Sequence, residues 1–324
     1  MEAVDQRDRE ILCELDRDSR ISYSKLGERI RMSHESVRYR VLRLIDRQVI
    51  NKFCTVVDAS KLGFVYHKVF LKLRNVNEES IERIINRLED DPFVTWAVRT
   101  EGKYDIGFAV KVATPGDVLE LGNLVESLAR DFDCFIGRRV FCTNLVGEYL
   151  TRDYLVHRKR SKAKSGFYSA GSLPLKLDET SLQIVRLLAK NARYSAVELS
   201  EHLPLSPDAV LHRMKKLERD KVITRYNLVL NHHTLQQMHF KVFIYLNQIS
   251  SEQQNAFYAK CKTNPHVVFV LKTLAEWDLE LDVEVPDFST YRCVMLELTN
   301  DYASIIKDYE SLLVSRIYKY TLFT

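Results

Sequence analysis

The chain has 324 residues, of which 46% are hydrophobic and 28% are charged, and its net charge is +4. This length allows two or more domains, and no apolar run approaches the roughly 18 residues that a membrane span needs. The charged N-terminus is unlike a signal peptide, the six cysteines lack CxxC spacing, and neither GxGxxG nor GxxxxGK[ST] occurs. We therefore expect a cytoplasmic protein with no membrane segment, metal site, disulfide framework or cofactor.

Three short amphipathic segments begin the chain. Apolar residues at helical spacing predict a first helix over residues 5–16, and Ser22 is a suitable N-cap for a second. After a tight turn, Ser33 can cap a third helix with one apolar face. Three such helices are typical of a helix-turn-helix, and the alternating strand that follows, NKFCTVV, is the expected wing.

A mixed pattern follows the first three helices. Alternating apolar residues predict four strands, and apolar residues at helical spacing predict two intervening helices, in the order β-α-β-β-α-β. This order is that of a ferredoxin-like domain, whose sheet carries helices on one face. The other face has to be covered, so two such modules should pair, either within one chain or between chains.

The whole pattern occurs twice. A shift of 173 residues aligns Asp5 with Asp178, Arg20 with Arg193 and Asp105 with Asp278 without a gap. The fold class is therefore α+β, with two copies of a winged helix-turn-helix followed by a ferredoxin-like βαββαβ domain. The expected boundaries are 1–53, 54–150, a basic linker over 151–175, 176–226 and 227–324.

The linker concentrates positive charge. Five basic residues fall within seven positions and are followed by serine and glycine, which is typical of a flexible segment. A solvated loop without any role in DNA binding is the alternative. The five residues are Arg158, Lys159, Arg160, Lys162 and Lys164.

The third helix of each copy is the candidate DNA-recognition element. In a helix-turn-helix this helix lies in the major groove, where arginine suits guanine and lysine or serine suits phosphate. A solvated face, or a helical scaffold without DNA, is the alternative; Arg40 and Arg213 are expected near the DNA backbone or in intramolecular pairs. The candidates are Ser33, His34, Glu35, Ser36, Arg38, Tyr39 and Arg43, then Ser206, Asp208, His212, Lys215 and Lys216.

Net charge separates the modules. The two trihelical segments carry +2 and +3 and the linker carries +5, whereas each ferredoxin-like segment carries −3. Positive charge is therefore placed where phosphates would be met, which favours double-stranded DNA as the partner.

The turn between the two middle strands of each sheet could bind a small molecule. Glycine permits an unusual backbone turn, and an acid and an aromatic ring can meet a zwitterion by charge and stacking. An ordinary hairpin turn with a capping aspartate is the alternative. The effector candidates are Thr100, Gly102, Tyr104 and Asp105 in copy one, and Thr273, Trp277 and Asp278 in copy two.

Several short motifs together carry a family resemblance. They are Asp5, Asp8-Arg9-Glu10-Ile11-Leu12, Asp18-Ser19-Arg20, Met32-Ser33, Arg40-Val41-Leu42-Arg43-Leu44, Val49-Ile50, Val57-Asp58, Lys61-Leu62-Gly63 and Gly102-Lys103-Tyr104-Asp105. In these motifs the chain resembles the Lrp/AsnC (leucine-responsive, feast/famine) regulators over nearly its whole length, twice.

The resemblance implies a transcriptional regulator of the prokaryotic nucleoid. Its α/β domains would be RAM-type domains that assemble homo-oligomers and respond to an amino acid or similar metabolite. Most relatives have one unit per chain, so this chain resembles a covalent pseudo-dimer. Copy two departs from the pattern, because Ala275 replaces the turn glycine Gly102 and Gln236 replaces Gly63, which places its effector site in doubt.

An enzyme is the chief alternative. The chain also resembles siroheme decarboxylases, which have the same two-domain architecture. Such an enzyme would use His and Arg side chains after the wing to hold tetrapyrrole carboxylates. A metal site at the adjacent histidines lacks a third ligand, and a partner-binding protein without DNA contact is a further alternative. The basic and aromatic residues relevant to the enzyme are Arg225, Tyr226, His232, His233 and His239, with Lys52, Phe53 and His67 in copy one.

Overall fold

The computed structural model describes residues 4–132, 135–158, 165–321 and 323. Each copy begins with three helices. The residue before each helix is a serine or an aspartate whose side chain accepts a hydrogen bond from a backbone amide of the first turn. In the first copy these helices are α1 (Gln6–Arg17), α2 (Tyr23–Ile30) and α3 (His34–Asp46). In the second they are α6 (Glu179–Lys190), α7 (Ala196–Ser200) and α8 (Pro207–Arg219). We call these sets the first and second trihelical units.

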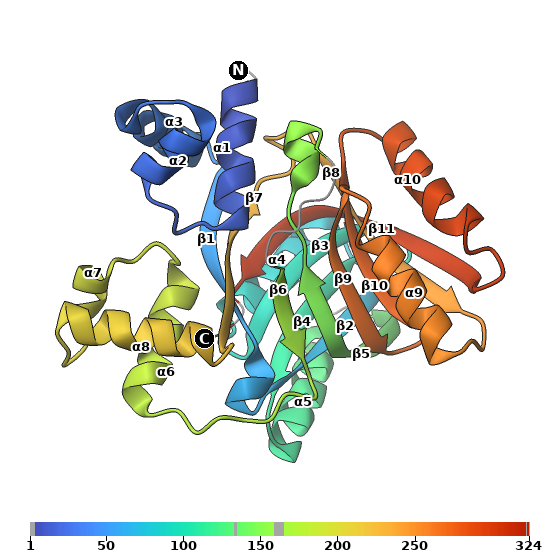
Figure 1. The fold of residues 1–324 in the computed structure, drawn as a ribbon. Helices are drawn as coiled ribbons and strands as arrows, with labels where there is room; N and C mark the ends of the chain where they lie inside the picture. The colour runs from blue at the N-terminus through green and yellow to red at the C-terminus, as the bar shows by residue number, and fades with distance from the viewer. Residues whose placement is uncertain (1–3, 133–134, 159–164, 322, 324) are drawn as a thin grey trace.

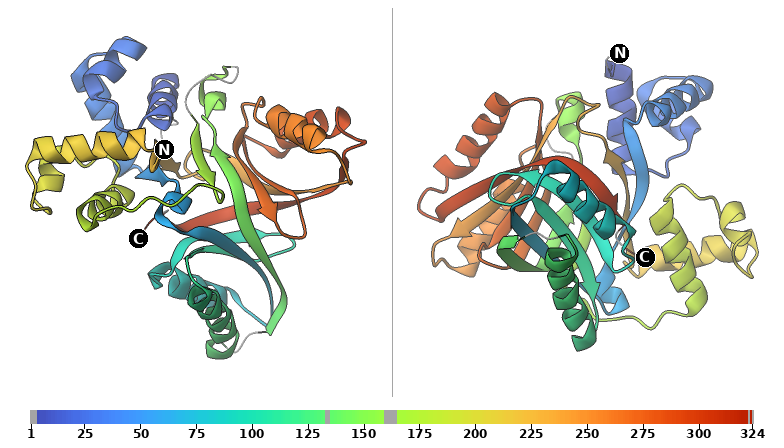
Figure 2. Two further views of the ribbon diagram at one scale, coloured as in Figure 1. Left: turned by 60° about the horizontal axis from the view of Figure 1, so that its bottom comes forward. Right: turned by 180° about the vertical axis from the view of Figure 1, so that it is seen from behind.

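Each trihelical unit is followed by the expected βαββαβ module, so the predicted α+β class is confirmed. The first module contains β2 (Val65–Arg74), α4 (Glu78–Asp90), β3 (Val94–Glu101), β4 (Ile106–Val112), α5 (Pro115–Asp131) and β5 (Phe135–Tyr149). The second contains β8 (Met238–Leu246), α9 (Ser251–Cys261), β9 (Val267–Leu274), β10 (Leu279–Val285), α10 (Phe288–Asn300) and β11 (Ile306–Tyr320). The views show the two trihelical units together on one side of these modules (Figures 1 and 2).

The two sheets close into one barrel within the chain. Strands run β2-β4-β3-β11-β8-β10-β9-β5, and β5 also pairs with β2, which completes the ring. The long strands β5 and β11, each of 15 residues, make this possible because one half of each pairs in its own module and the other half in the partner module. Strand edges that could otherwise recruit another chain are thereby used internally.

The strands expected as wings form, but they pair with one another. Strand β1 (Ile50–Val57) runs antiparallel to β7 (Ile223–Leu230), in a register from Ile50 opposite Leu230 to Val57 opposite Ile223. Each copy supplies one strand, so this two-stranded ribbon joins the copies instead of forming two separate hairpins. The difference from expectation arises because strand alternation identifies a strand without identifying its partner.

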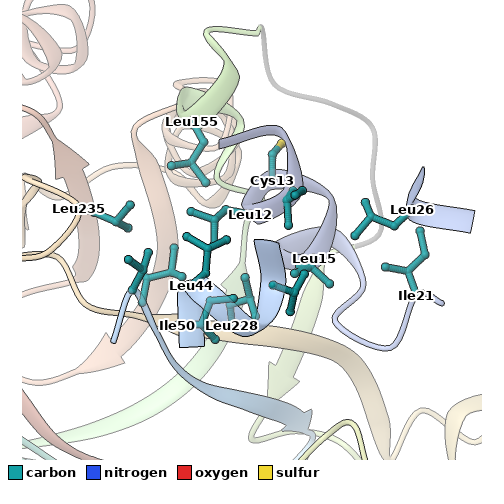
Figure 3. Packing of buried hydrophobic residues seen from close by; sticks show 14 of the residues in the cluster. Leu12, Cys13, Leu15, Ile21, Leu26, Leu44, Ile50, Leu155, Leu228 and Leu235 are labelled. Atoms are coloured by element: carbon teal, nitrogen blue, oxygen red, sulfur yellow. The ribbon is translucent and has the colours of Figure 1, made fainter. Parts of the chain in front are cut away.

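Each trihelical core uses residues from the other copy. Leu12, Leu15 and Leu44 of the first unit pack with Leu228 and Leu235 of the second copy (Figure 3). Conversely, Val57 of the first copy is buried in the core of the second unit. Burial of this shared apolar surface fixes the two units to the ribbon and therefore to each other.

The segment between the copies is partly ordered against the fold. Residues 153–156 form a 3-10 turn, and Leu155 is buried in the core of the first trihelical unit (Figure 3). Strand β6 (Gly166–Ser169) then extends the sheet beside β5. Much of the expected flexible linker is thus structured, whereas its basic positions 159, 160, 162 and 164 lie outside the described residues.

The described residues contain neither a helix that could span a membrane nor a disulfide bond. No helix among them has the length and apolar character needed to cross a membrane. The cysteines at 13, 54, 142, 261 and 293 are all free thiols, and Cys134 lies outside the described part.

Candidate nucleic-acid interface

The third helix of each trihelical unit has one buried face and one free face. Ser33 caps α3 by accepting a hydrogen bond from the Ser36 amide at 3.2 Å, and Ser206 caps α8 by accepting one from the Ala209 amide at 3.3 Å. The buried faces are apolar, with Val37, Val41 and Leu44 in α3 and Val210, Met214 and Leu217 in α8. The opposite faces are left available for contact with a duplex.

Most of the predicted DNA-binding side chains lie on those free faces. Tyr39 is 66% exposed, so its ring lies open on the free face of α3. Within the described part of the chain, Arg38, Lys215 and Lys216 make no ion pair and remain available to phosphates. The exposed candidates are Ser33, His34, Glu35, Ser36, Arg38 and Tyr39 on α3, and Ser206, Asp208, His212, Lys215 and Lys216 on α8.

Arg43 departs from its predicted place. Its guanidinium donates to Asp8 at 2.7 Å, and Asp8 also accepts from Arg40 at 2.8 Å. The Asp8 side chain is 0% exposed, so both arginines serve to hold α3 against α1. Arg40 also pairs with Asp5 at 2.6 Å, and Arg213 makes the equivalent pair with Asp178 at 2.6 Å in copy two. The expected intramolecular pairing of Arg40 and Arg213 is therefore found, and Arg43 joins Arg40 in it.

Two equivalent arginines tie the trihelical units together. Arg20 of copy one donates to the carbonyl oxygens of Ala192 and Tyr194 in copy two, the latter at 2.8 Å. In return, Arg193 donates to the Ser19 carbonyl at 2.8 Å. These reciprocal contacts, with the β1–β7 ribbon, set the separation of α3 and α8. The sequence marks both arginines as equivalent in the repeat, but it does not show that they cross between copies.

A buried ionic cluster connects the first trihelical unit to the barrel. Asp16 on α1 accepts from Arg152 at 2.6 Å and from Arg225 at 2.9 Å. Arg152 also donates to Glu284 of β10 at 2.8 Å, and His232 lies 2.8 Å from the same carboxylate. Burial alone would raise the pKa of Glu284, but Arg152 and His232 outweigh it and hold the pKa well below its ordinary value.

This cluster uses the basic residues that an enzyme of this architecture would need. Arg225 is held by Asp16 and also donates to the Tyr149 carbonyl at 2.8 Å, while His232 is held by Glu284. His239 lies 3.5 Å from Asp282, and Tyr226 donates to Glu218 at 2.7 Å. His232 and His239 also line one cavity of about 40 Å³ together with Arg152 and Glu284, and neither ring nitrogen of His239 has a hydrogen-bond partner among the described residues.

The threonines and aspartates of the predicted effector turns are hydrogen-bonded within their own surroundings, whereas the Tyr104 hydroxyl and Trp277 Nε1 are buried without a hydrogen-bond partner among the described residues. Asp105 accepts from the Lys72 ammonium at 2.6 Å and from the Leu73 amide at 2.7 Å, and Thr100 donates to the Tyr104 carbonyl at 2.9 Å. In copy two, Asp278 accepts from the Leu246 amide at 2.7 Å and Thr273 donates to the Trp277 carbonyl at 2.8 Å. Each turn therefore has the geometry of a hairpin with a capping aspartate.

The aromatic residues of both turns close one end of the barrel. Tyr104 and Trp277 are 0% and 1% exposed, and Trp277 stacks on Phe243 with ring centroids 3.9 Å apart. Phe70 is the counterpart of Phe243 and lies 5.0 Å from it. Gly102 has a φ of +132°, which residues with a side chain rarely adopt. A Cβ at this position would lie only 3.2 Å from Leu312 of copy two. The turns thus contribute to packing between the copies.

Comparison with known proteins agrees with this geometry. Residues 4–45 match the AsnC-type helix-turn-helix domain, and residues 177–224 match the winged helix-turn-helix DNA-binding family. The leucine-responsive regulatory protein of Salmonella typhimurium is 33% identical over 122 residues, which are 37% of this chain and 74% of that protein. An uncharacterized HTH-type transcriptional regulator of Pyrococcus abyssi is 26% identical over 126 residues, 39% of this chain and 82% of that protein.

A solved structure resembles the whole chain. The siroheme decarboxylase NirDL, in co-complex with an iron-uroporphyrin III analogue, has a TM-score of 0.58, covering 98% of this chain and 94% of that one. The identity is only 13%, so this likeness concerns the fold. The regulators instead share sequence with the chain over most of their own length. The chain therefore belongs to the Lrp/AsnC family of DNA-binding transcriptional regulators.

Proposed function

We propose that this protein is a sequence-specific regulator in which two unlike DNA-binding units act as a covalent pseudo-dimer. The main support is that the two copies pair within one chain, through the β1–β7 ribbon and through the closed barrel. The units differ where they would meet bases, with Arg38 and Tyr39 on α3 and His212 and Lys215 on α8. They should therefore bind an imperfect palindrome whose half-sites lie on one face of the duplex, about one helical turn or an integral number of turns apart.

We further propose that a small metabolite of the amino-acid class shifts the placement of the two units. Such a ligand acts only through different affinities for two arrangements of the protein. The ion pairs from Asp16 through Arg152 to Glu284 give the barrel a direct physical connection to α1. Assembly into larger homo-oligomers would use surfaces other than the sheet edges that pair within the chain, and the site of action would be chromosomal DNA in the cytoplasm.

In vitro selection from a random duplex pool tests the DNA-binding proposal. Purified full-length chain is incubated with the pool at low and moderate salt, and bound sequences are enriched over several rounds. We expect an asymmetric two-part site, with one half altered by substitution of Arg38 and the other by substitution of Lys215. Failure to retain any duplex, together with an absorbance change on adding a tetrapyrrole, would instead favour a decarboxylase-like enzyme.

A further inference from the structure

A cavity lies inside the barrel, between the sheets of the two copies. Its volume is about 60 Å³, and residues from both ferredoxin-like modules line it. On the same scale one water molecule needs about 10–15 Å³, so the space corresponds to about five waters. This is too small for a macrocycle and suits a ligand with a handful of non-hydrogen atoms.

Four charged side chains beside the cavity balance one another. Lys68 and its repeat counterpart Lys241 both donate to Glu280 at 2.5 Å, and Lys241 also donates to Asp282 at 2.6 Å. The side chains of Lys241 and Glu280 are 2% and 0% exposed, so water provides little screening. A ligand with net charge would leave one buried charge uncompensated, whereas a zwitterion adds equal amounts of both.

The cavity also contains an unused acceptor. Asn144 is 7% exposed, and its side-chain oxygen is buried without a hydrogen-bond partner among the described residues. Buried polar atoms are normally paired, so a missing donor is expected at this position. An ammonium group supplies such a donor, while the ammonium groups of Lys68 and Lys241 can receive a carboxylate.

The walls restrict the rest of the ligand. The Lys68 ammonium lies 5.6 Å from the ring centroids of both Trp96 and Phe269, so these aromatic rings enclose the charged group closely. Ala109 lies on the same wall and is 4% exposed. Together with the volume, this leaves room for a short aliphatic or hydroxymethyl side chain and excludes a long one.

The cavity communicates with the first trihelical unit. Asp282 borders it and also borders a neighbouring cavity of about 40 Å³, which Arg152 and Glu284 line. Arg152 pairs with Asp16 of α1. The equivalent of Asp16 in the second unit is Ala189, which cannot form this pair. A ligand in the cavity therefore lies beside the cavity whose ion pairs reach α1 of the first unit, and it also lies beside Val57, which is buried in the core of the second unit.

We propose that the barrel cavity binds one small zwitterionic α-amino acid per chain, of the size of glycine, L-alanine or L-serine. The carboxylate is bound by Lys68 and Lys241, and the ammonium donates to Asn144. This places the ligand inside the barrel and away from the turns at Gly102 and Ala275. The binding itself stands on the cavity, whereas its regulatory consequence rests on the proposed DNA-binding function.

Isothermal titration of the full-length chain with glycine, L-alanine and L-serine tests this assignment. We expect at least one of the three to bind with a stoichiometry of one, and acetate and methylamine, which each carry half of the zwitterion, to bind at least tenfold more weakly. Asn144→Leu should weaken binding at least tenfold by removing the acceptor. Ala109→Val, which fills the cavity from another wall, should do the same, and melting curves verify that both variants fold.

Lys103→Ala is the matched control, because Lys103 lies within the turn of copy one and not at the cavity. It should leave the affinity unchanged. The proposal is overturned if none of the three amino acids binds the unaltered chain, or if Lys103→Ala abolishes binding that both cavity variants retain. Retention on a duplex is measured separately: a chain that binds DNA but no amino acid refutes this proposal alone, and the reverse result refutes only the proposed DNA-binding function.

Discussion

The unpaired cations of the recognition helices give a quantitative prediction for DNA binding. Arg38, Lys215 and Lys216 are exposed and make no ion pair within the described residues, whereas Arg40 and Arg213 are already paired with carboxylates. Each phosphate contact contributes about −0.9 to the slope of log affinity against log salt. Replacing all three free cations with alanine should therefore make the slope shallower by about 2.7. Over a fourfold rise in salt, each lost contact should account for about 3.5-fold in affinity.

Fluorescence anisotropy with a labelled duplex of arbitrary sequence measures this slope between 50 and 200 mM salt, because non-specific binding depends on the same phosphate contacts. The control is Arg130→Ala on α5, whose side chain is 75% exposed and belongs to the barrel module. Its slope should equal that of the unaltered chain. A triple variant with an unchanged slope would show that these helices do not meet the phosphates, and the placement of both recognition helices would then be incorrect.

Three further predictions concern the interface between the copies. Trp277→Ala should lower the free energy of unfolding by about 3–5 kcal/mol, measured by urea denaturation, because the ring is 1% exposed and its removal leaves a cavity. Asp16→Ala should cost a similar amount of about 3–5 kcal/mol, since it leaves Arg225 buried without its carboxylate, whereas Glu10→Ala in an exposed pair should cost less than about 1 kcal/mol. Because the folded pKa of Glu284 lies well below 4.5, its contribution to stability is present above that pH and is lost as the pH falls. The unfolding free energy of Glu284→Gln should therefore depend less steeply on pH below about 4.5 than that of the unaltered chain, and an identical pH dependence would contradict the ion pairs assigned to this carboxylate.

Local patterns in the sequence predict the elements well. Ser22, Ser33 and Ser206 begin helices because their hydroxyl groups can accept from free backbone amides, and this interaction needs only nearby residues. Apolar alternation likewise identifies the strands of both ferredoxin-like modules. These features depend on sequence neighbours, so one sequence suffices to find them.

Partners that are distant in sequence could not be predicted in the same way. Helical spacing places Arg43 on a polar face, but it does not show that Asp8 approaches that face. Strand alternation identifies β1 and β7 without showing that they pair. The alternating carboxylates Glu280, Asp282 and Glu284 would suit a solvent-facing side of a strand, yet closure of the barrel turns that side inward.

The inward charges show what duplication within one chain makes possible. Glu280 and Asp282 correspond by repeat position to Gly107 and Ala109, so only one copy supplies carboxylates to the pair of equivalent lysines. In a symmetric dimer each residue would occur twice: two lysines would face four of these carboxylates or none, and a buried charge imbalance would follow. Covalent linkage removes this constraint, because each copy can change without changing the other. The balanced interior, and the presence of Asp16 in the first unit with Ala189 at the same repeat position of the second, are therefore arrangements that a homodimer of identical copies could not form.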